Sequence, residues 1–145
     1  MVGAMARGDE KLEHLRSVRL FSAASKKELS LLGKAADEVT VPEGHELTRE
    51  GAVGHEFFLI MDGEAKVKMK GRTVATLGKG QYFGELALLD KGPRNATVTA
   101  STPMTLLVLG QREFAAVLDE VPTLCHKLLQ MMASRLREAD ARAVQ

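Results

Sequence analysis

The sequence predicts an α+β fold that is mainly β: a sandwich or barrel of short strands with helices before and after it. Between Glu38 and Leu109, short β-branched or aromatic runs alternate with glycine, proline and asparagine, a texture typical of sandwiches and barrels. On both sides of this region the apolar residues recur with the period of an amphipathic helix. With 145 residues, the chain is expected to bury such a core as a single domain, residues 1–145.

Two N-terminal helices are expected within residues 9–36. In the first, from Asp9 to Leu20, leucines and a valine recur among charged residues. The second, from Lys26 to Ala36, follows a capping-box pattern, since the Ser25 hydroxyl and the Glu28 carboxylate can each bond to the other residue's backbone N–H.

The β-region is expected to cover residues 38–109. Six runs have the composition of strands: Val39–Val41, Phe57–Ile60, Ala65–Met69, Thr73–Leu77, Ala96–Ala100 and Met104–Leu109. The segment Lys70–Thr73 between two of them predicts a tight hairpin, because Gly71 can take a positive φ there.

A C-terminal pair of helices is expected within residues 112–141. The first runs from Arg112 to Leu118, and the second from Thr123 to about Ala141, after a proline suited to the first helical position.

The last helix carries an apolar stripe that includes Leu124, Leu128 and Leu136. This stripe either packs entirely on the chain's own barrel or pairs with the same helix of a second copy to form a homodimer.

Composition narrows the function classes. The net charge of +1 gives no general attraction for nucleic acid. The single cysteine, Cys125, cannot form an internal disulfide, which fits a cytoplasmic protein. The sequence shows no apolar run of membrane-spanning length, and its four histidines are scattered, so neither a membrane span nor a metal cofactor is expected.

The segment from Phe83 to Val98 carries groups suited to a small anion. Gly84 allows a close backbone approach, and the short turn that starts at Glu85 leaves its first N–H groups without helical partners. Arg94 offers a planar fork of donors that fits phosphate oxygens. The Glu85 carboxylate only accepts hydrogen bonds, so its natural partner is a sugar hydroxyl. A phosphate and a ribose together indicate a nucleotide.

This segment resembles the phosphate-binding cassette of cyclic nucleotide-binding domains. That cassette has the pattern Phe-Gly-Glu-x-Ala-Leu, followed after a few residues by Pro-Arg-x-Ala-Thr-Val, and residues 83–98 supply each fixed position. The family's earlier glycine pattern is also present at Gly44, Gly51 and Gly63, and the resemblance covers about residues 20–138. It implies a double-stranded β-helix, a jelly-roll-like barrel flanked by helices.

The resemblance also implies roles for individual residues. Glu85 would hold the ribose 2′-OH and Arg94 the cyclic phosphate. The expected cyclic-nucleotide-binding residues are Gly84, Glu85, Leu86, Ala87, Arg94, Asn95 and Ala96, with backbone N–H groups of Leu86, Ala87 and Ala96 assisting. Residues expected to pack on the base are Val67, Val74 and Arg135.

The ligand expected from the resemblance is cyclic AMP, with cyclic GMP left open. In the family a threonine directly after the cassette arginine favours cyclic GMP, and alanine or serine goes with cyclic AMP. This chain has Asn95 instead. A hydroxyl pair that contacts adenine in bacterial regulators would fall at Ala139 and Asp140, neither of which has a hydroxyl.

By resemblance, the chain is a sensor and not an enzyme, and its last helix would move when ligand binds. Its partner would be an output protein or domain outside this sequence, since no DNA-binding element is found up to Gln145, where bacterial regulators begin a helix-turn-helix. Two alternatives remain: a barrel without ligand that acts as a docking or dimerisation platform, and a cupin-like metalloenzyme.

Overall fold

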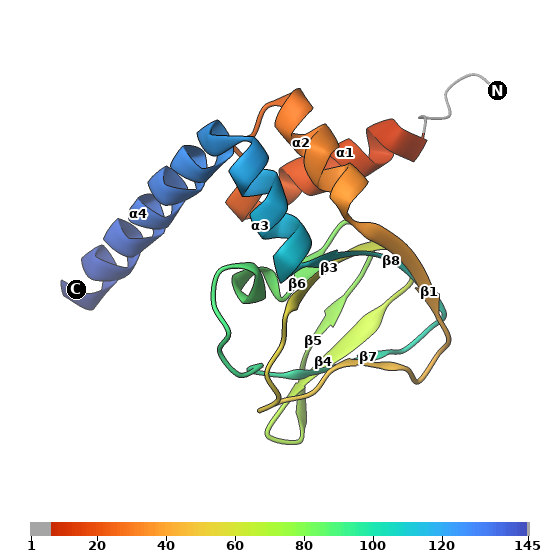
Figure 1. Ribbon diagram of the computed structural model, residues 1–145. Coiled ribbons are helices and arrows are strands. Elements are labelled where there is room, and N and C mark those ends of the chain that lie inside the picture. Colours follow the sequence, from red (N-terminus) through yellow and green to blue (C-terminus); the bar gives the residue numbers. More distant parts are fainter. Residues whose placement is uncertain (1–6, 145) are drawn as a thin grey trace.

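The computed structural model describes residues 7–144, which form two antiparallel sheets of four strands each and a group of helices beside them (Figure 1). One sheet has the strand order β1-β8-β3-β6 and the other β2-β7-β4-β5. The strands are β1 (Asp37–Val41), β2 (Glu46–Thr48), β3 (Glu56–Asp62), β4 (Ala65–Met69), β5 (Arg72–Leu77), β6 (Tyr82–Phe83), β7 (Thr97–Ala100) and β8 (Met104–Gly110). The predicted jelly-roll-like barrel is confirmed, and β2 and β6 are additions to the six predicted strands.

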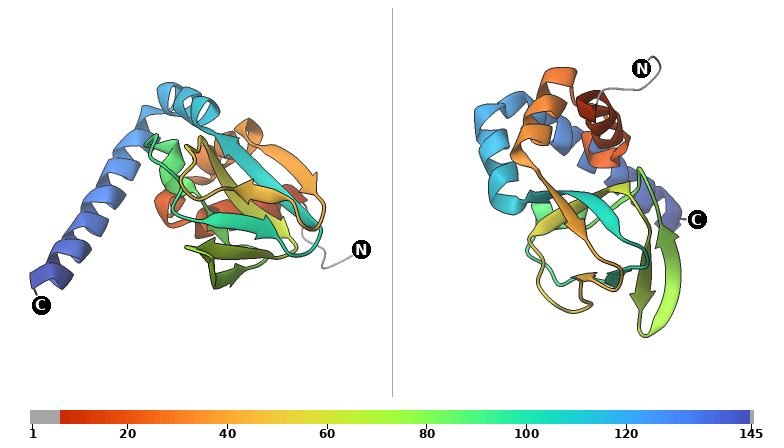
Figure 2. Two further views of the ribbon diagram at one scale, coloured as in Figure 1. Left: turned by 90° about the horizontal axis from the view of Figure 1, so that it is seen from below. Right: turned by 90° about the vertical axis from the view of Figure 1, so that its right-hand side faces the viewer.

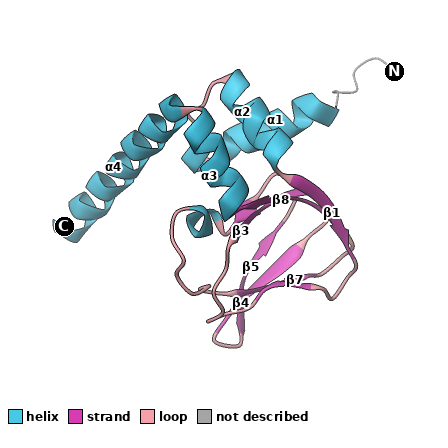
Figure 3. Cartoon of the chain, in the orientation of Figure 1, coloured by secondary structure: helices cyan, strands magenta, loops and turns pink. Residues whose placement is uncertain are grey.

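The helices lie together on one side of the barrel (Figure 3). They are α1 (Arg7–Ser17), the 3₁₀ turn η1 (Arg19–Phe21), α2 (Lys26–Ala35), the 3₁₀ turn η2 (Glu85–Leu88), α3 (Gln111–Glu120) and α4 (Pro122–Val144). The capping box at the start of α2 forms as expected, because Ser25 Oγ accepts from the Glu28 N–H and the Glu28 carboxylate accepts from the Ser25 N–H.

Strand β3 is buried on both faces and separates two apolar clusters. Phe57, Leu59 and Met61 point toward the helices, where Phe57 packs edge to face with Phe21 at 5.8 Å between ring centroids. The alternate residues Phe58 and Ile60 point into the space between the two sheets. Each such side chain contributes about 1.5–3 kcal/mol by its burial, so β3 is the strand that joins the helical layer to the barrel.

The β4–β5 hairpin turns at Lys70 and Gly71, as the sequence predicts. Both residues have positive φ, 52° and 78° respectively. This pair matches a type I′ turn, whose twist suits a two-residue hairpin.

The start of α4 is fixed to α2 by a buried carboxylate. Glu28 is 4% exposed and accepts hydrogen bonds from Thr123 Oγ1 and Lys127 Nζ, both at 2.7 Å. Leu124 and Leu128, on the same side of α4, are buried in the helical cluster. The first two turns of α4 are therefore held by packing and by a charged hydrogen bond.

The second half of α4 leads away from the barrel (Figure 2). Its contact with the rest of the chain includes an ion pair between Glu138 and Arg19 of η1. Leu129 and Leu136 are each 64% exposed. The apolar stripe thus packs on the chain's own helices over its first half, while pairing of the second half with another copy stays a prediction. Among the described helices, none is long and apolar enough to cross a membrane.

Candidate functional site

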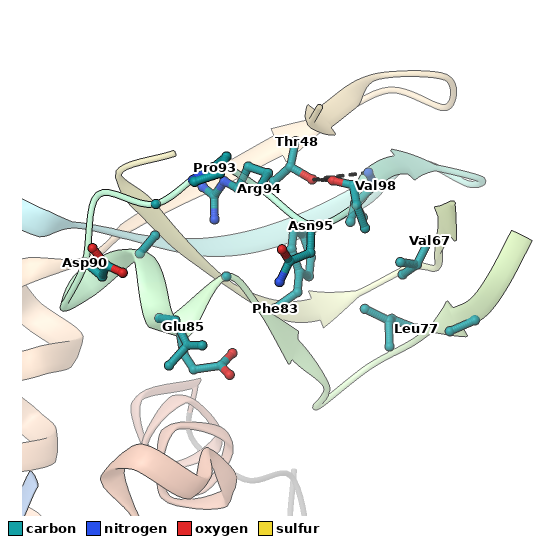
Figure 4. Close-up of a pocket in the computed structure, with 16 residues that line it drawn as sticks. Thr48, Val67, Leu77, Phe83, Glu85, Asp90, Pro93, Arg94, Asn95 and Val98 are labelled. Carbon is teal, nitrogen blue, oxygen red and sulfur yellow. Dashed lines mark hydrogen bonds between the residues drawn. The ribbon is translucent and has the colours of Figure 1, made fainter. Parts of the chain in front are cut away.

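A cavity of about 600 Å³ opens between β4, β5 and β7 on one side and residues 83–96 on the other (Figure 4). Its apolar wall includes Val67, Leu77 and Val98, and its polar wall includes Glu85 and Arg94. This volume is within the range of about 300–1,000 Å³ that is usual for small-molecule sites, so one ligand can contact both walls.

The backbone fixes Arg94 at the edge of this cavity. Its N–H donates to the Ala52 carbonyl and its own carbonyl accepts from the Gly51 N–H, both at 2.8 Å. An isolated β-bridge pairs the neighbouring Pro93 with Val53. The loop that follows β2 therefore holds the arginine segment as a neighbouring strand would.

The guanidinium of Arg94 has a defined position as well. Its Nη2 donates to the Glu56 carbonyl at 2.7 Å, and its Cζ lies 5.8 Å from the centre of the Phe58 ring. Phe58 in turn stacks on Phe83 of the cavity wall, with 4.8 Å between ring centroids. Arg94 is thus supported by a carbonyl and an aromatic face, which keep its remaining donors close to the cavity.

Two glycines make room for Arg94. A Cβ at Gly84 would lie 2.5 Å from Arg94 Nη1, and a Cβ at Gly54 would overlap the guanidinium. Gly84 also has a φ of 79°, which side-chain-bearing residues rarely adopt. The glycine before the cassette glutamate is therefore required both by backbone conformation and by the space that Arg94 occupies.

Arg94 is a partly buried cation. Burial lowers the pKa of Arg94, and the nearby Glu56 carboxylate acts in the opposite direction. Guanidinium groups remain charged in proteins. Among the described residues, the hydrogen bond to Glu56 is the one that this side chain makes, out of five possible donors. A half-buried positive charge with spare donors is suited to an anion with several oxygens.

Glu85 lies on a different part of the cavity wall. It begins η2, directly after Gly84, and is half-buried. In Figure 4 the side chains of Glu85 and Arg94 lie well separated, and the Glu85 side chain points away from Arg94. No ion pair joins Glu85 to Arg94 in the part of the chain that the structure describes. The carboxylate is therefore not neutralised by Arg94 and can accept a hydrogen bond from a hydroxyl donor.

The three predicted backbone donors differ in their surroundings. The Ala87 N–H already donates to the Gly84 carbonyl at 3.1 Å, so the turn itself uses this donor. Leu86 and Ala96 both line the cavity. Asn95 is exposed and also lines the cavity.

Thr48 lines the cavity but carries no recognisable signal in the sequence. It is 8% exposed, and its Oγ1 donates to the Ala96 carbonyl at 3.1 Å and accepts from the Val98 N–H at 3.2 Å (Figure 4). A β-bulge between Glu46 and Thr48 interrupts the pairing of β2 with β7 at this point. Thr48 thus bonds the C-terminal end of the cassette in place of a backbone group.

Val74, predicted to pack on a base, does not line the cavity in this structure. Counting back from the hairpin turn, Val67 should pair with Val74, but a bulge after Val67 shifts the register, so that Val67 pairs with Ala75. Val67 and Ala75 consequently line the cavity, whereas Val74 is 54% exposed outside it. The bulge is a local irregularity that the alternating sequence does not reveal.

Arg135 is not part of the cavity wall either. It lies on the second half of α4, which leads away from the barrel (Figure 1). A contact between Arg135 and a base therefore remains a prediction, one that requires α4 to lie over the cavity.

Comparison with known proteins identifies the family. A family model described as cyclic nucleotide-binding domain matches residues 38–121, which include every residue of the cavity wall. The chain belongs to the cyclic nucleotide-binding domain family. The predicted resemblance to this family is confirmed. A family of cyclic nucleotide-binding domains replaces the cupin-like metalloenzyme as the explanation of the barrel.

Relatives of this cyclic nucleotide-binding domain occur in two kinds of protein. The cyclic AMP receptor protein of Thermus thermophilus is 32% identical over 126 residues, which are 83% of this chain and 58% of the relative. A cAMP-dependent protein kinase regulatory subunit of Yarrowia lipolytica is 40% identical over 109 residues, 74% of this chain and 29% of the relative. The chain therefore spans less than two thirds of the length of either relative.

A solved structure has the same fold as this chain over most of the length of both. The N-terminal domain of a transcriptional regulator from Streptomyces coelicolor A3(2) has a TM-score of 0.83 and 34% identity, with 89% of this chain and 93% of that chain covered.

The cassette of this cyclic nucleotide-binding domain forms one side of the cavity. All seven residues predicted as ligand contacts line it: Gly84, Glu85, Leu86, Ala87, Arg94, Asn95 and Ala96. The role of each residue toward a ligand remains a prediction.

Proposed function

We propose that the chain is a sensor module that binds cyclic AMP in the cavity beside the cassette and does not transform it. The observation that supports this most is the half-buried Arg94, whose guanidinium has spare donors at the edge of a cavity with Glu85 on another part of its wall. A nucleotide with a cyclic phosphate matches this arrangement because it carries an anion, a sugar hydroxyl and an apolar base in one molecule.

Each part of such a ligand has a complementary surface. Arg94 would bind the cyclic phosphate, because a guanidinium can contact two phosphate oxygens at once. Glu85 would accept a hydrogen bond from the ribose 2′-OH. The base would rest against Val67, Ala75 and Leu77, which form the apolar wall.

The choice of cyclic AMP rests on the relatives. Two are described as a cyclic AMP receptor protein and a cAMP-dependent protein kinase regulatory subunit. Cyclic GMP is the second candidate ligand, because the exposed amide of Asn95 at the cavity can donate as well as accept.

The signal would pass through α4. Its first two turns are fixed to α2, while its second half leads away from the barrel and leaves the cavity uncovered by Arg135 (Figure 2). A ligand that contacts α4 only when the helix lies over the cavity would shift the population toward that arrangement. An output protein or domain would then respond to the position of α4.

The test is a calorimetric titration with cyclic AMP and, separately, with cyclic GMP. The variant Arg94→Ala should weaken binding by about 10- to 100-fold, since a charge-assisted hydrogen bond contributes about 1.5–3 kcal/mol. Arg112→Ala is the matched control, because Arg112 is an exposed arginine on α3 outside the cavity wall. This variant should bind like the wild type.

Absence of heat with both nucleotides would contradict the proposal, provided that the protein is folded and free of co-purified nucleotide. That result would favour the docking-platform alternative. Equal affinity of Arg94→Ala and Arg112→Ala would contradict the assigned role of Arg94.

A further inference from the structure

Gln111 bonds both to the cassette turn in the cavity wall and to the segment that supports Arg94. It is the first residue of α3 and is partly buried. Its backbone N–H donates to the His55 carbonyl at 2.8 Å, and its side-chain Nε2 donates to the Ala87 carbonyl at 3.2 Å. One residue thus connects the start of β3, the 3₁₀ turn of the cassette and the start of α3.

The first bond supports the position of Arg94. His55 stands between Gly54, against which the guanidinium packs, and Glu56, whose carbonyl accepts from Arg94 Nη2. When the Gln111 N–H holds the His55 carbonyl, it fixes the path of the chain through both of these contacts. This bond belongs to the backbone and persists whatever side chain occupies position 111.

The second bond supports the position of Glu85. Ala87 lies in η2, the short turn that begins with Glu85, and its N–H is used inside the turn. Leu88 also anchors this turn, because it is buried in the helical cluster. The Gln111 amide is therefore a polar connection, additional to this apolar anchor, between the cassette turn and α3.

We propose that Gln111 is a positioning residue for the nucleotide site: its side-chain amide holds the cassette turn in register with the Arg94 segment. This inference rests on the proposed function. A site whose carboxylate and guanidinium are already correctly spaced loses less freedom when a ligand binds to both. Removing the amide lets the turn shift relative to Arg94. Glu85 and Arg94 then no longer have the spacing needed to bind the sugar and the phosphate at the same time.

The test compares variants that keep the length of the side chain. Gln111→Met removes the donor and should weaken cyclic AMP binding by about 3- to 10-fold, the range expected for one neutral hydrogen bond. Gln111→Glu places a carboxylate against the Ala87 carbonyl and should weaken binding further. Gln111→Lys restores an N–H donor on a flexible chain and should recover part of the affinity. The matched control is Gln130→Met, since Gln130 is an exposed glutamine on α4.

The melting temperature of each variant without ligand separates positioning from general loss of structure. Because buried Leu88 still anchors the turn, Gln111→Met should bind more weakly while its melting temperature stays close to that of the Gln130→Met control. A fall in melting temperature that accounts for the whole loss of affinity would contradict the positioning role.

The outcomes distinguish this inference from the proposed function. If the wild type binds neither nucleotide, the proposed function fails. If the wild type binds but Gln111→Met binds equally well, or Gln111→Lys recovers nothing, the role of Gln111 is wrong while the proposed function stands.

Discussion

The hydroxyl of Thr48 makes hydrogen bonds that the backbone of a neighbouring strand would otherwise make. At the bulge in β2, its Oγ1 accepts from the Val98 N–H and donates to the Ala96 carbonyl, two groups that a regular strand neighbour would satisfy. Both groups lie at the C-terminal end of the cassette, close to Arg94. The hydroxyl therefore contributes to the stability of the barrel and to the shape of the site.

Replacing Thr48 by valine keeps the size of the side chain but leaves these groups without partners. We expect the free energy of unfolding to fall by about 2 kcal/mol. The corresponding fall in melting temperature is about 5 °C. Thermal unfolding of Thr48→Val beside Thr76→Val measures this, because Thr76 is an exposed threonine on β5. Equal melting temperatures of the two variants would show that the hydroxyl is not needed.

Site residues that lie close together in the sequence could be predicted, whereas a residue whose partners lie far along the chain could not. Glu85 and Arg94 were identified because they stand in one continuous segment with a recognisable pattern, and both line the cavity. Thr48 has no such signal, since its partners Ala96 and Val98 are about fifty residues away. A contact between distant residues depends on strand register, which a single sequence does not show.

At the level of the elements, the long periodic segments were predicted well and the short ones were not. The capping box located the start of α2 at Lys26, as observed. Strands β2 and β6 have three and two residues, which is too short for an alternating pattern to develop. The bulge in the β4–β5 hairpin was not predictable either: one extra residue reverses which side chains face the cavity, so Ala75 and not Val74 lines it.

The connection between α2 and α4 depends on the charge of Glu28. Burial alone would raise the pKa of Glu28, but hydrogen bonds from Lys127, the Ser25 N–H and Thr123 outweigh it and lower the pKa from 4.5 to about 2. The unfolded chain therefore takes up this proton at a higher pH than the folded chain does. The stability that results is fully present above pH 4.5 and is lost as the pH falls toward 2.

The variant Glu28→Gln tests this dependence on pH. We expect it to unfold with about 1–3 kcal/mol less free energy than the wild type at pH 7, a range that allows for solvent screening. The difference should shrink between pH 4.5 and pH 2, because the wild-type carboxylate is then protonated. Urea unfolding at several pH values measures it, with Glu13→Gln, an exposed glutamate on α1, as control. A difference that does not depend on pH would rule out the charge as its origin.

On the scale of the whole molecule, α4 is held at both ends by different kinds of contact. Its start is buried against α2, whereas its second half is held by the ion pair of Glu138 with Arg19, two side chains that are about half exposed. The hydrogen bond from Arg19 lowers the pKa of Glu138. The outer contact is therefore the weaker one, and a movement of α4 would begin there.

If α4 moves over the cavity when ligand binds, the Glu138–Arg19 pair stabilises only the ligand-free arrangement. Removing it in Glu138→Gln should strengthen cyclic AMP binding, by less than about fivefold, because exposed ion pairs contribute little. Calorimetric titration beside Glu120→Gln, an exposed glutamate on α3, checks this. Weaker binding by Glu138→Gln than by the control would contradict the proposed movement.

The fold class was predictable because segments with the apolar spacing of helices are clearly separated along the chain from segments with the composition of strands. Helical spacing before residue 38 and after residue 109 encloses a region of short strands, and the structure has the same order. The direction of α4 was not predictable, since an apolar stripe says which face prefers burial but not which surface will cover it.

The sequence of strand β3 determines how it can pair with its neighbouring strands during folding. Five consecutive apolar residues, Phe57 to Met61, are buried on one face or the other, so a slip by one residue would still bury apolar side chains. The charged ends, Glu56 and Asp62, are exposed. A slip would carry one of these carboxylates into the interior, where an unpaired charge is very costly. The register of β3 with its neighbouring strands is therefore fixed by the two charges at its ends and not by the apolar run between them.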